Sequence, residues 1–225
     1  MVRAVIFDVD GTLIDSVDLH AEAWQKVFAH FGHEIPYERV REQIGKGGDQ
    51  LMPVFLSEQE IRDKGEELEK WRGELYKSEY MHRVRPFPRV RELVLKLKNE
   101  GKQIALASSA KEDEVKYYKE VAEIGDLLDA KTSSDDAEKS KPHPDIFQAA
   151  LARLDGVKAE EAIVIGDTPY DAEAAGKAGM ATIGLLCGGF PKRSLLEAGC
   201  VEIYMSPADL LDHFEESVLC EKKAA

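Results

Sequence analysis

The chain has 225 residues, of which 44% are hydrophobic and 32% charged, and its formal net charge is −13. This length is enough for one α/β domain or for a core domain with a smaller insertion. The acidic balance argues against a nucleic-acid backbone or an anionic membrane surface as a partner, and we expect neither. Three cysteines without CxxC spacing, and no apolar run approaching the length of about 20 residues that spans a membrane, predict a soluble, cytoplasmic protein with reduced thiols.

Short apolar segments alternate with helical patterns along most of the chain. Buried strands are predicted at 3–9, 103–108, 162–167, 181–186 and 201–205. Helices are predicted at 88–101, 112–125, 145–156 and 171–179, and several of them close on glycine. This alternation predicts an α/β fold, a Rossmann-like three-layer core with a parallel sheet covered by helices on both faces. Residues 207–225 predict a closing amphipathic helix and a frayed tail.

The interval from 16 to 84 interrupts the alternation. Helical patterns cover 16–32, 37–45 and 57–83, and nothing in the interval resembles a strand. Ser57 followed by Glu60 fits a capping box at the start of the last of these helices. We therefore expect an all-helical domain at 16–84, inserted into a core domain formed by 1–15 and 85–225.

Polar residues follow the predicted strands at their carboxyl ends, where ligands bind in open α/β sheets. They are Asp8 and Asp10, Ser108 and Ser109, Lys141 at a loop-to-helix junction, and Asp167 with Asp171 four residues on. Two carboxylates placed two residues apart after an apolar strand repel each other and are costly to bury. That repulsion is the reason to expect a metal ion beside Asp8 and Asp10.

This set of side chains suits attack on a phosphate ester. One carboxylate can serve as the nucleophile, and a second can protonate the leaving oxygen and then activate water. Mg²⁺ suits a site with few carboxylates and substrate oxygens, while a hydroxyl, a lysine and the N–H groups of the Gly11–Thr12 turn can hold phosphoryl oxygens. Taken singly, a lysine such as Lys141 is more often a solvated side chain or a helix-entry residue. Asp167 alone is at least as typical of a helix cap, and Ser108 and Ser109 alone are ordinary cap residues.

Four motifs in order resemble those of the haloacid dehalogenase (HAD) superfamily, in its Mg²⁺-dependent phosphatase branch. They are "DVDGTL" at 8–13, "ALASS" at 105–109, Lys141 within "SKPHPDIF" at 140–147, and "GDTPYD" at 166–171. The resemblance covers essentially the whole chain. The helical insertion resembles the cap of phosphoglycolate phosphatases and β-phosphoglucomutase, so the resemblance implies a cap domain over the active site.

The resemblance also implies roles for these residues. Asp8 would be the nucleophile and Asp10 the general acid and base. Asp8, the backbone carbonyl of Asp10, and Asp167 would hold Mg²⁺, and Asp171 would support the metal through water or hydrogen bonds. Ser108 and Lys141 would bind the phosphoryl group, and Thr12 would support the first loop. Together with these three residues, we count Gly11 and Ser109 among the predicted phosphate-binding residues.

The cap should determine which substrate is accepted, because it closes over the site. The glycine-rich loop at 44–53 is the predicted specificity loop, with Lys46 and Asp49 as its polar candidates; a helix connector with surface charges explains them equally well. His20 lies one turn before Trp24. It is open between facing the substrate and packing within the cap, and the pattern favours packing.

The sequence therefore predicts an enzyme, a phosphoric monoester hydrolase that acts on a small phosphorylated metabolite such as a sugar phosphate or a phosphoglycolate-like compound through an aspartyl phosphate. A phosphosugar mutase of the β-phosphoglucomutase type is an alternative, although the loop "KGGD" lacks the serine and arginine of that mutase. A HAD-like binding protein without catalysis is another alternative. The natural substrate stays open, and the oligomeric state is open between a monomer and a small homo-oligomer.

Overall fold

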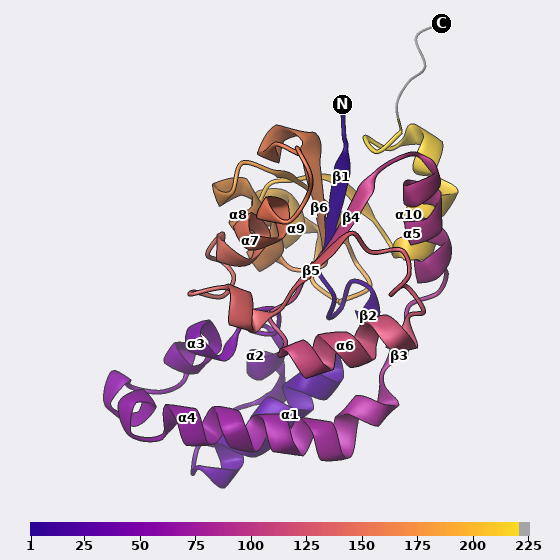
Figure 1. Ribbon diagram of the computed structural model, residues 1–225. Helices are drawn as coiled ribbons and strands as arrows, with labels where there is room; N and C mark the ends of the chain where they lie inside the picture. The colour runs from indigo at the N-terminus through magenta and orange to yellow at the C-terminus, as the bar shows by residue number, and fades with distance from the viewer. Residues whose placement is uncertain (221–225) are drawn as a thin grey trace, which may run out of the picture.

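A six-stranded parallel sheet forms the centre of the computed structural model, which describes residues 1–220 (Figure 1). The strand order is β5-β4-β1-β6-β7-β8. The bounds of these strands are β1 Ala4–Phe7, β4 Gln103–Ala107, β5 Ala130–Thr132, β6 Ala162–Gly166, β7 Ala181–Leu185 and β8 Cys200–Tyr204. The parallel α/β core predicted from the alternating pattern is confirmed, with β1 in the interior of the sheet between β4 and β6.

Strand β5 was not among the predicted strands. It has only three residues, Ala130, Lys131 and Thr132, and it pairs with β4 at the edge of the sheet. A strand this short, with a lysine at its centre, has no apolar run that distinguishes it from a loop. The segment is a strand because it pairs with β4, and its own sequence gives no local indication of that pairing.

Helices cover both faces of the sheet, as predicted. Their bounds are α5 Val90–Asn99, α6 Glu112–Val121, α7 Asp145–Ala152, α8 Pro169–Lys177, α9 Lys192–Glu197 and α10 Pro207–Asp212, with single 3₁₀ turns η4 Ser134–Asp136, η5 Ala159–Glu161 and η6 Phe214–Glu216. Alternate residues of β1 serve the two faces: Val5 and Phe7 belong to the cluster with α5, α6 and α10, and Ala4 and Ile6 to the cluster with α7 and α8. All four side chains are fully buried.

The segment between β2 and β3, residues 17–83, is helical throughout its regular structure, and Figure 1 shows it lying beyond the carboxyl ends of the sheet strands. Its elements are α1 Val17–His30, α2 Tyr37–Arg41, α3 Gly48–Leu51, η1 Met52–Val54, α4 Glu58–Leu75, η2 Tyr76–Tyr80 and η3 Met81–Arg83. We call this segment the helical insertion. It has its own core, in which Trp24, Val27 and Phe28 of α1 are buried.

The capping box predicted at Ser57 and Glu60 is confirmed: the Ser57 side chain accepts from the Glu60 N–H, and the Glu60 carboxylate accepts from the Ser57 N–H at 2.9 Å. The helical pattern expected over 57–83 is less regular than one α-helix, because α4 passes at Tyr76 into a π-helical turn and then into a 3₁₀ turn. Two short strands, β2 Ile14–Asp15 and β3 Arg85–Pro86, pair antiparallel where the chain enters and leaves the insertion.

Among residues 1–220, no helix has the length and apolar character needed to cross a membrane. The closing helix predicted near the carboxyl terminus is present as α10, followed by a 3₁₀ turn. The tail predicted beyond it, at 221–225, lies outside the described residues.

Candidate active site

Asp8 and Asp10 lie on the loop that follows β1, in the centre of the sheet edge. The buried strand continues its hydrogen bonding as far as Asp8, whose N–H donates to the carbonyl of Ile165 at 2.9 Å. Gly11 then turns the chain with a positive φ of 85°, a conformation that costs glycine little. The Thr12 hydroxyl lies 2.9 Å from Oδ1 of Asp167 and 3.3 Å from Oδ2 of Asp8. The Thr12 hydroxyl thereby links Asp8 of the first motif to Asp167 of the fourth.

Lys141 joins three of the sequence motifs. Its side chain is 1% exposed, and Nζ lies 2.5 Å from Oδ1 of Asp8 and 2.8 Å from Oδ1 of Asp171. Asp171 is placed by a capping box at the start of α8, where its Oδ2 accepts from the N–H and hydroxyl of Thr168. The helix-entry and solvated-side-chain alternatives for Lys141 do not describe this buried ammonium group.

Asp8, Asp167 and Asp171 form a buried acidic cluster, whose nearest oxygens all lie within 4.8 Å of one another. Oδ2 of Asp167 is buried and has no hydrogen-bond partner among the described residues. Burial raises the pKa of Asp8 to about 7 against the opposing charge of Lys141, and burial followed by the charge of Asp8 raises the pKa of Asp167. Three carboxylates with one lysine and an unfilled carboxylate oxygen fit a divalent, oxygen-preferring cation such as Mg²⁺.

Gly188, in the loop after β7, packs closely against the side chain of Asp167. A Cβ added at Gly188 would overlap Oδ2 of Asp167, whereas a Cβ at Gly176 in α8 would meet no atom within 4 Å. We expect Gly188→Ala to lower the free energy of unfolding by about 1–3 kcal/mol through this overlap. We expect Gly176→Ala, its control, to leave that free energy unchanged or to raise it by up to about 1 kcal/mol. Urea unfolding of both variants provides the measurement, and equal midpoints would contradict the packing described.

Asp10 is oriented by two donors that both contact Oδ1. The Ser16 hydroxyl lies 2.6 Å away and Nε2 of His20 lies 2.9 Å away. Burial opposes ionisation, but His20 and Ser16 together outweigh it and lower the pKa of Asp10. Because both donors contact Oδ1, Oδ2 is the oxygen of Asp10 that is left to exchange a proton with a substrate or water.

His20 is buried, and its ring stacks on that of Tyr76 with centroids 4.0 Å apart. The guanidinium of Arg72 can only donate, and it lies 2.9 Å from Nδ1 of His20, so Nδ1 must accept and Nε2 must carry the proton donated to Asp10. The ring is therefore packed, as the pattern favours, and it also contacts the candidate acid and base, while contact of His20 with a substrate stays a prediction.

The two serines of the second motif differ in their contacts. Ser108 is fully buried, and its Oγ accepts from the N–H of Ala110 at 3.0 Å. Oγ of Ser109 is buried without a partner among the described residues, and Ser109 lines a small cavity of about 40 Å³ together with Asp8, Asp10 and Lys141. Ser109 is thus the serine that lines this cavity, whereas Ser108 uses its Oγ as an acceptor and keeps its hydroxyl proton to donate.

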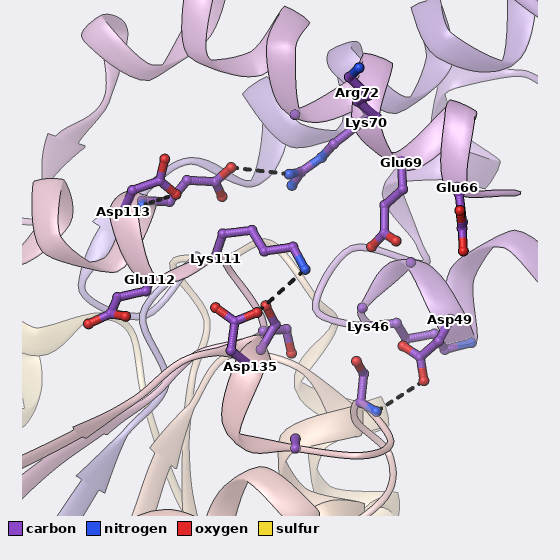
Figure 2. A pocket seen from close by; sticks show the side chains of 18 of the residues that line it. Lys46, Asp49, Glu66, Glu69, Lys70, Arg72, Lys111, Glu112, Asp113 and Asp135 are labelled. Carbon is purple, nitrogen blue, oxygen red and sulfur yellow. Dashed lines mark hydrogen bonds and ion pairs between the residues drawn. The ribbon is translucent and has the colours of Figure 1, made fainter.

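The cap candidates Lys46 and Asp49 both line a second, larger cavity of about 890 Å³ between the helical insertion and the core (Figure 2). Lys46 donates to Oε1 of Gln43 at 2.6 Å and lies 4.5 Å from the centre of the Tyr170 ring. Asp49 accepts from the N–H of Ser140, next to Lys141, at 3.1 Å. The predicted specificity loop therefore contacts the core beside the third motif.

Sequence reasoning missed Arg72 and Glu114, which meet between α4 and α6 at 3.3 Å although 42 residues separate them. Arg72 also contacts His20, and the Glu114 side chain is 0% exposed. In the sequence, Arg72 is one of many charges on a long helix, and Glu114 is one of three acidic residues in the first turn of α6. Neither pattern distinguishes these residues from ordinary surface charges.

Comparisons with known proteins agree with this geometry. Residues 5–185 match the model of a family described as haloacid dehalogenase-like hydrolase. A phosphorylated carbohydrates phosphatase from Thermotoga maritima is 29% identical over 95% of this chain and 99% of its own, and a phosphoglycolate phosphatase from Aquifex aeolicus is 30% identical over 80% and 83%. The crystal structure of a hydrolase from Pseudomonas syringae superimposes with a TM-score of 0.83 at 27% identity, covering 95% of this chain and 98% of that one.

Proposed function

Because this chain belongs to the haloacid dehalogenase-like hydrolase family, we propose that it is a Mg²⁺-dependent phosphatase that hydrolyses a small phosphate monoester through an aspartyl phosphate. The observation that carries the proposal is the convergence of Asp8, Lys141, Asp167 and Asp171 in one buried cluster beside Asp10. The two relatives' names, a phosphorylated carbohydrates phosphatase and a phosphoglycolate phosphatase, support the class of substrate.

In the first step of this proposal, a carboxylate oxygen of Asp8 bonds to phosphorus while the bond from phosphorus to the ester oxygen breaks. The pKa of Asp10 is lowered in the substrate-free protein, so Oδ2 must take up its proton as the anionic phosphate binds, since a nearby negative charge favours the neutral carboxyl. This proton then passes to the departing oxygen, so that the product leaves as an alcohol. Asp10 then withdraws a proton from a water molecule, whose oxygen attacks phosphorus and releases inorganic phosphate and the Asp8 carboxylate. Ser16 and His20 hold Asp10 in position for both transfers.

Lys141 and the polar groups of the second motif are proposed to hold the phosphoryl oxygens. Lys141 is close enough to Asp8 to contact an oxygen of a phosphoryl group transferred there. Asp8, Asp167 and the Asp10 backbone carbonyl would hold Mg²⁺, with Asp171 supporting it, and the bound ion would neutralise the carboxylates and the phosphoryl charge. We also propose that residues 16–84 act as a cap domain over the core formed by 1–15 and 85–225.

Phosphate release from a panel of monoesters, measured with Mg²⁺ and with a chelator, tests this function. We expect turnover with Mg²⁺ and its loss with the chelator, because three mutually repelling carboxylates cannot hold an anionic phosphoryl group unaided. Mg²⁺ should also raise the melting temperature of the native protein, and less so that of Asp167→Asn. Absence of turnover on every monoester, with a bound metal, would transfer support to a mutase that needs a bisphosphate or to a binding protein.

A further inference from the structure

The two cavities at the candidate active site are adjacent and share part of their lining. Trp24, Lys46, Arg72 and Ser109 line both the small cavity at Asp8 and the larger cavity of about 890 Å³. A phosphoryl group bound at Asp8 would therefore place the remainder of its ester in the larger cavity. The side chains of that cavity are the ones that decide which leaving group is accepted.

The wall of the larger cavity is predominantly acidic. Nine of its lining side chains are carboxylates and five are cationic, an excess of four negative charges. Figure 2 shows these groups on both sides of the cavity, with Glu66 and Glu69 on α4 of the helical insertion and Asp135 on the core. A leaving group that carries a carboxylate or a second phosphate would enter a field of its own sign.

Four of the five cations of the wall are paired with carboxylates, and the fifth, Lys46, donates to Gln43. Lys111 lies 3.7 Å from Asp135 and Lys77 lies 2.5 Å from Asp113, so both pair with carboxylates of the same wall. Arg72 pairs with Glu114 at 3.3 Å, and Lys70 lies 4.0 Å from Glu74. Of these pairs only that of Arg72 with Glu114 is buried, so a second anion that took Arg72 would have to break a buried ion pair, which removes much of the gain.

Arg72 and Glu114 leave one donor and one acceptor unfilled. Nε of Arg72 and Oε2 of Glu114 are buried without hydrogen-bond partners among the described residues, and both residues line the larger cavity. A hydroxyl group fits such a pair, because it donates its proton to one oxygen and accepts from one N–H. A carboxylate or phosphate group offers only acceptors and would meet the negative charge of Glu114.

We propose that this chain selects phosphate monoesters whose leaving group is an uncharged, hydroxyl-bearing polyol or sugar, and that Glu114 and Arg72 bind one of its hydroxyls. This inference rests on the proposed phosphatase function. It favours the activity named for the phosphorylated carbohydrates phosphatase over that named for the phosphoglycolate phosphatase. A sugar leaving group is uncharged, whereas glycolate carries a carboxylate.

The first test compares kcat/KM for glycerol 3-phosphate and glucose 6-phosphate with that for phosphoglycolate, with 4-nitrophenyl phosphate as an ester lacking aliphatic hydroxyls. We expect the better of the two polyol phosphates to exceed phosphoglycolate by about tenfold or more. Turnover of 4-nitrophenyl phosphate together with a preference for phosphoglycolate would overturn this inference and leave the phosphatase function standing. Failure to hydrolyse any of the four would instead count against the phosphatase function itself.

The second test is Glu114→Gln. The guanidinium of Arg72 requires an acceptor, so the amide oxygen should face it and the amide NH₂ should take the place of Oε2. The substitution therefore replaces the acceptor Oε2 by an NH₂ donor, which can no longer accept the proton of a substrate hydroxyl. We expect the ratio of kcat/KM for the polyol phosphate to that for phosphoglycolate to fall about tenfold.

Glu120→Gln is the matched control, because Glu120 is exposed on the same helix α6 and does not line the cavity. We expect it to leave the ratio unchanged. Should Glu114→Gln fail to fold by circular dichroism, Glu69→Gln on the opposite wall should lower the ratio in the same direction by a smaller factor. A folded Glu114→Gln or Glu69→Gln protein that keeps the native ratio overturns the assignment.

Discussion

The Asp8→Asn variant is expected to release phosphate about 10⁴-fold more slowly than the native protein, or not measurably. An amide oxygen is a far weaker nucleophile than a carboxylate, and no neighbouring carboxylate is placed to substitute. Asp167 and Asp171 lie in the same cluster, but Asp171 is held by Thr168 and Lys141, and Asp167 contacts Thr12. The measurement is phosphate release from the best ester of the panel, with Mg²⁺ in excess.

The same variant should keep its fold, which distinguishes loss of chemistry from loss of structure. Burial and neighbouring carboxylates already disfavour the charge on Asp8, so its removal relieves repulsion and should not lower the melting temperature. Asp155→Asn, at an exposed position outside the site, is the control and should retain native turnover. Substantial turnover by Asp8→Asn would exclude Asp8 as the nucleophile.

Replacing Lys141 by Ala should have the largest effect on stability. It leaves Asp8 and Asp171 buried without the ammonium group that contacts both of them, at 2.5 and 2.8 Å. Removing one partner of a buried ion pair typically lowers the free energy of unfolding by about 3–5 kcal/mol. We expect a loss of this size, together with loss of turnover, because the same lysine is proposed to hold the phosphoryl oxygens.

Lys139→Ala provides the comparison, since Lys139 lies two residues earlier and is exposed. Its free energy of unfolding should stay within about 0.5 kcal/mol of the native value, as is usual for surface substitutions. Urea unfolding measures both variants under the same conditions. Equal unfolding midpoints for the two variants would show that Lys141 does not compensate the buried carboxylates.

The sequence alone determined the parallel α/β core and the residues that line its sheet edge. Apolar strands such as 4–7 have a local signature, and so do the turn at Gly11 and the capping box at Ser57, because each depends on residues within a few positions. The order of the four motifs placed Asp8, Lys141 and Asp171 at one edge, where the structure brings them together. Their catalytic roles stay predictions until the variants are measured.

Only the tertiary structure decided how the larger cavity is built. The contact of Arg72 with Glu114, the contact of Arg72 with His20, and the acidic excess of the cavity wall all join segments far apart in the chain. Strand β5 likewise exists because β4 offers it a partner. Charged residues on helices carry no local mark of which neighbour they will meet, since that depends on how the helical insertion lies over the sheet. The reaction class was therefore readable from local motifs, whereas the charges and contacts that line the larger cavity required the folded chain.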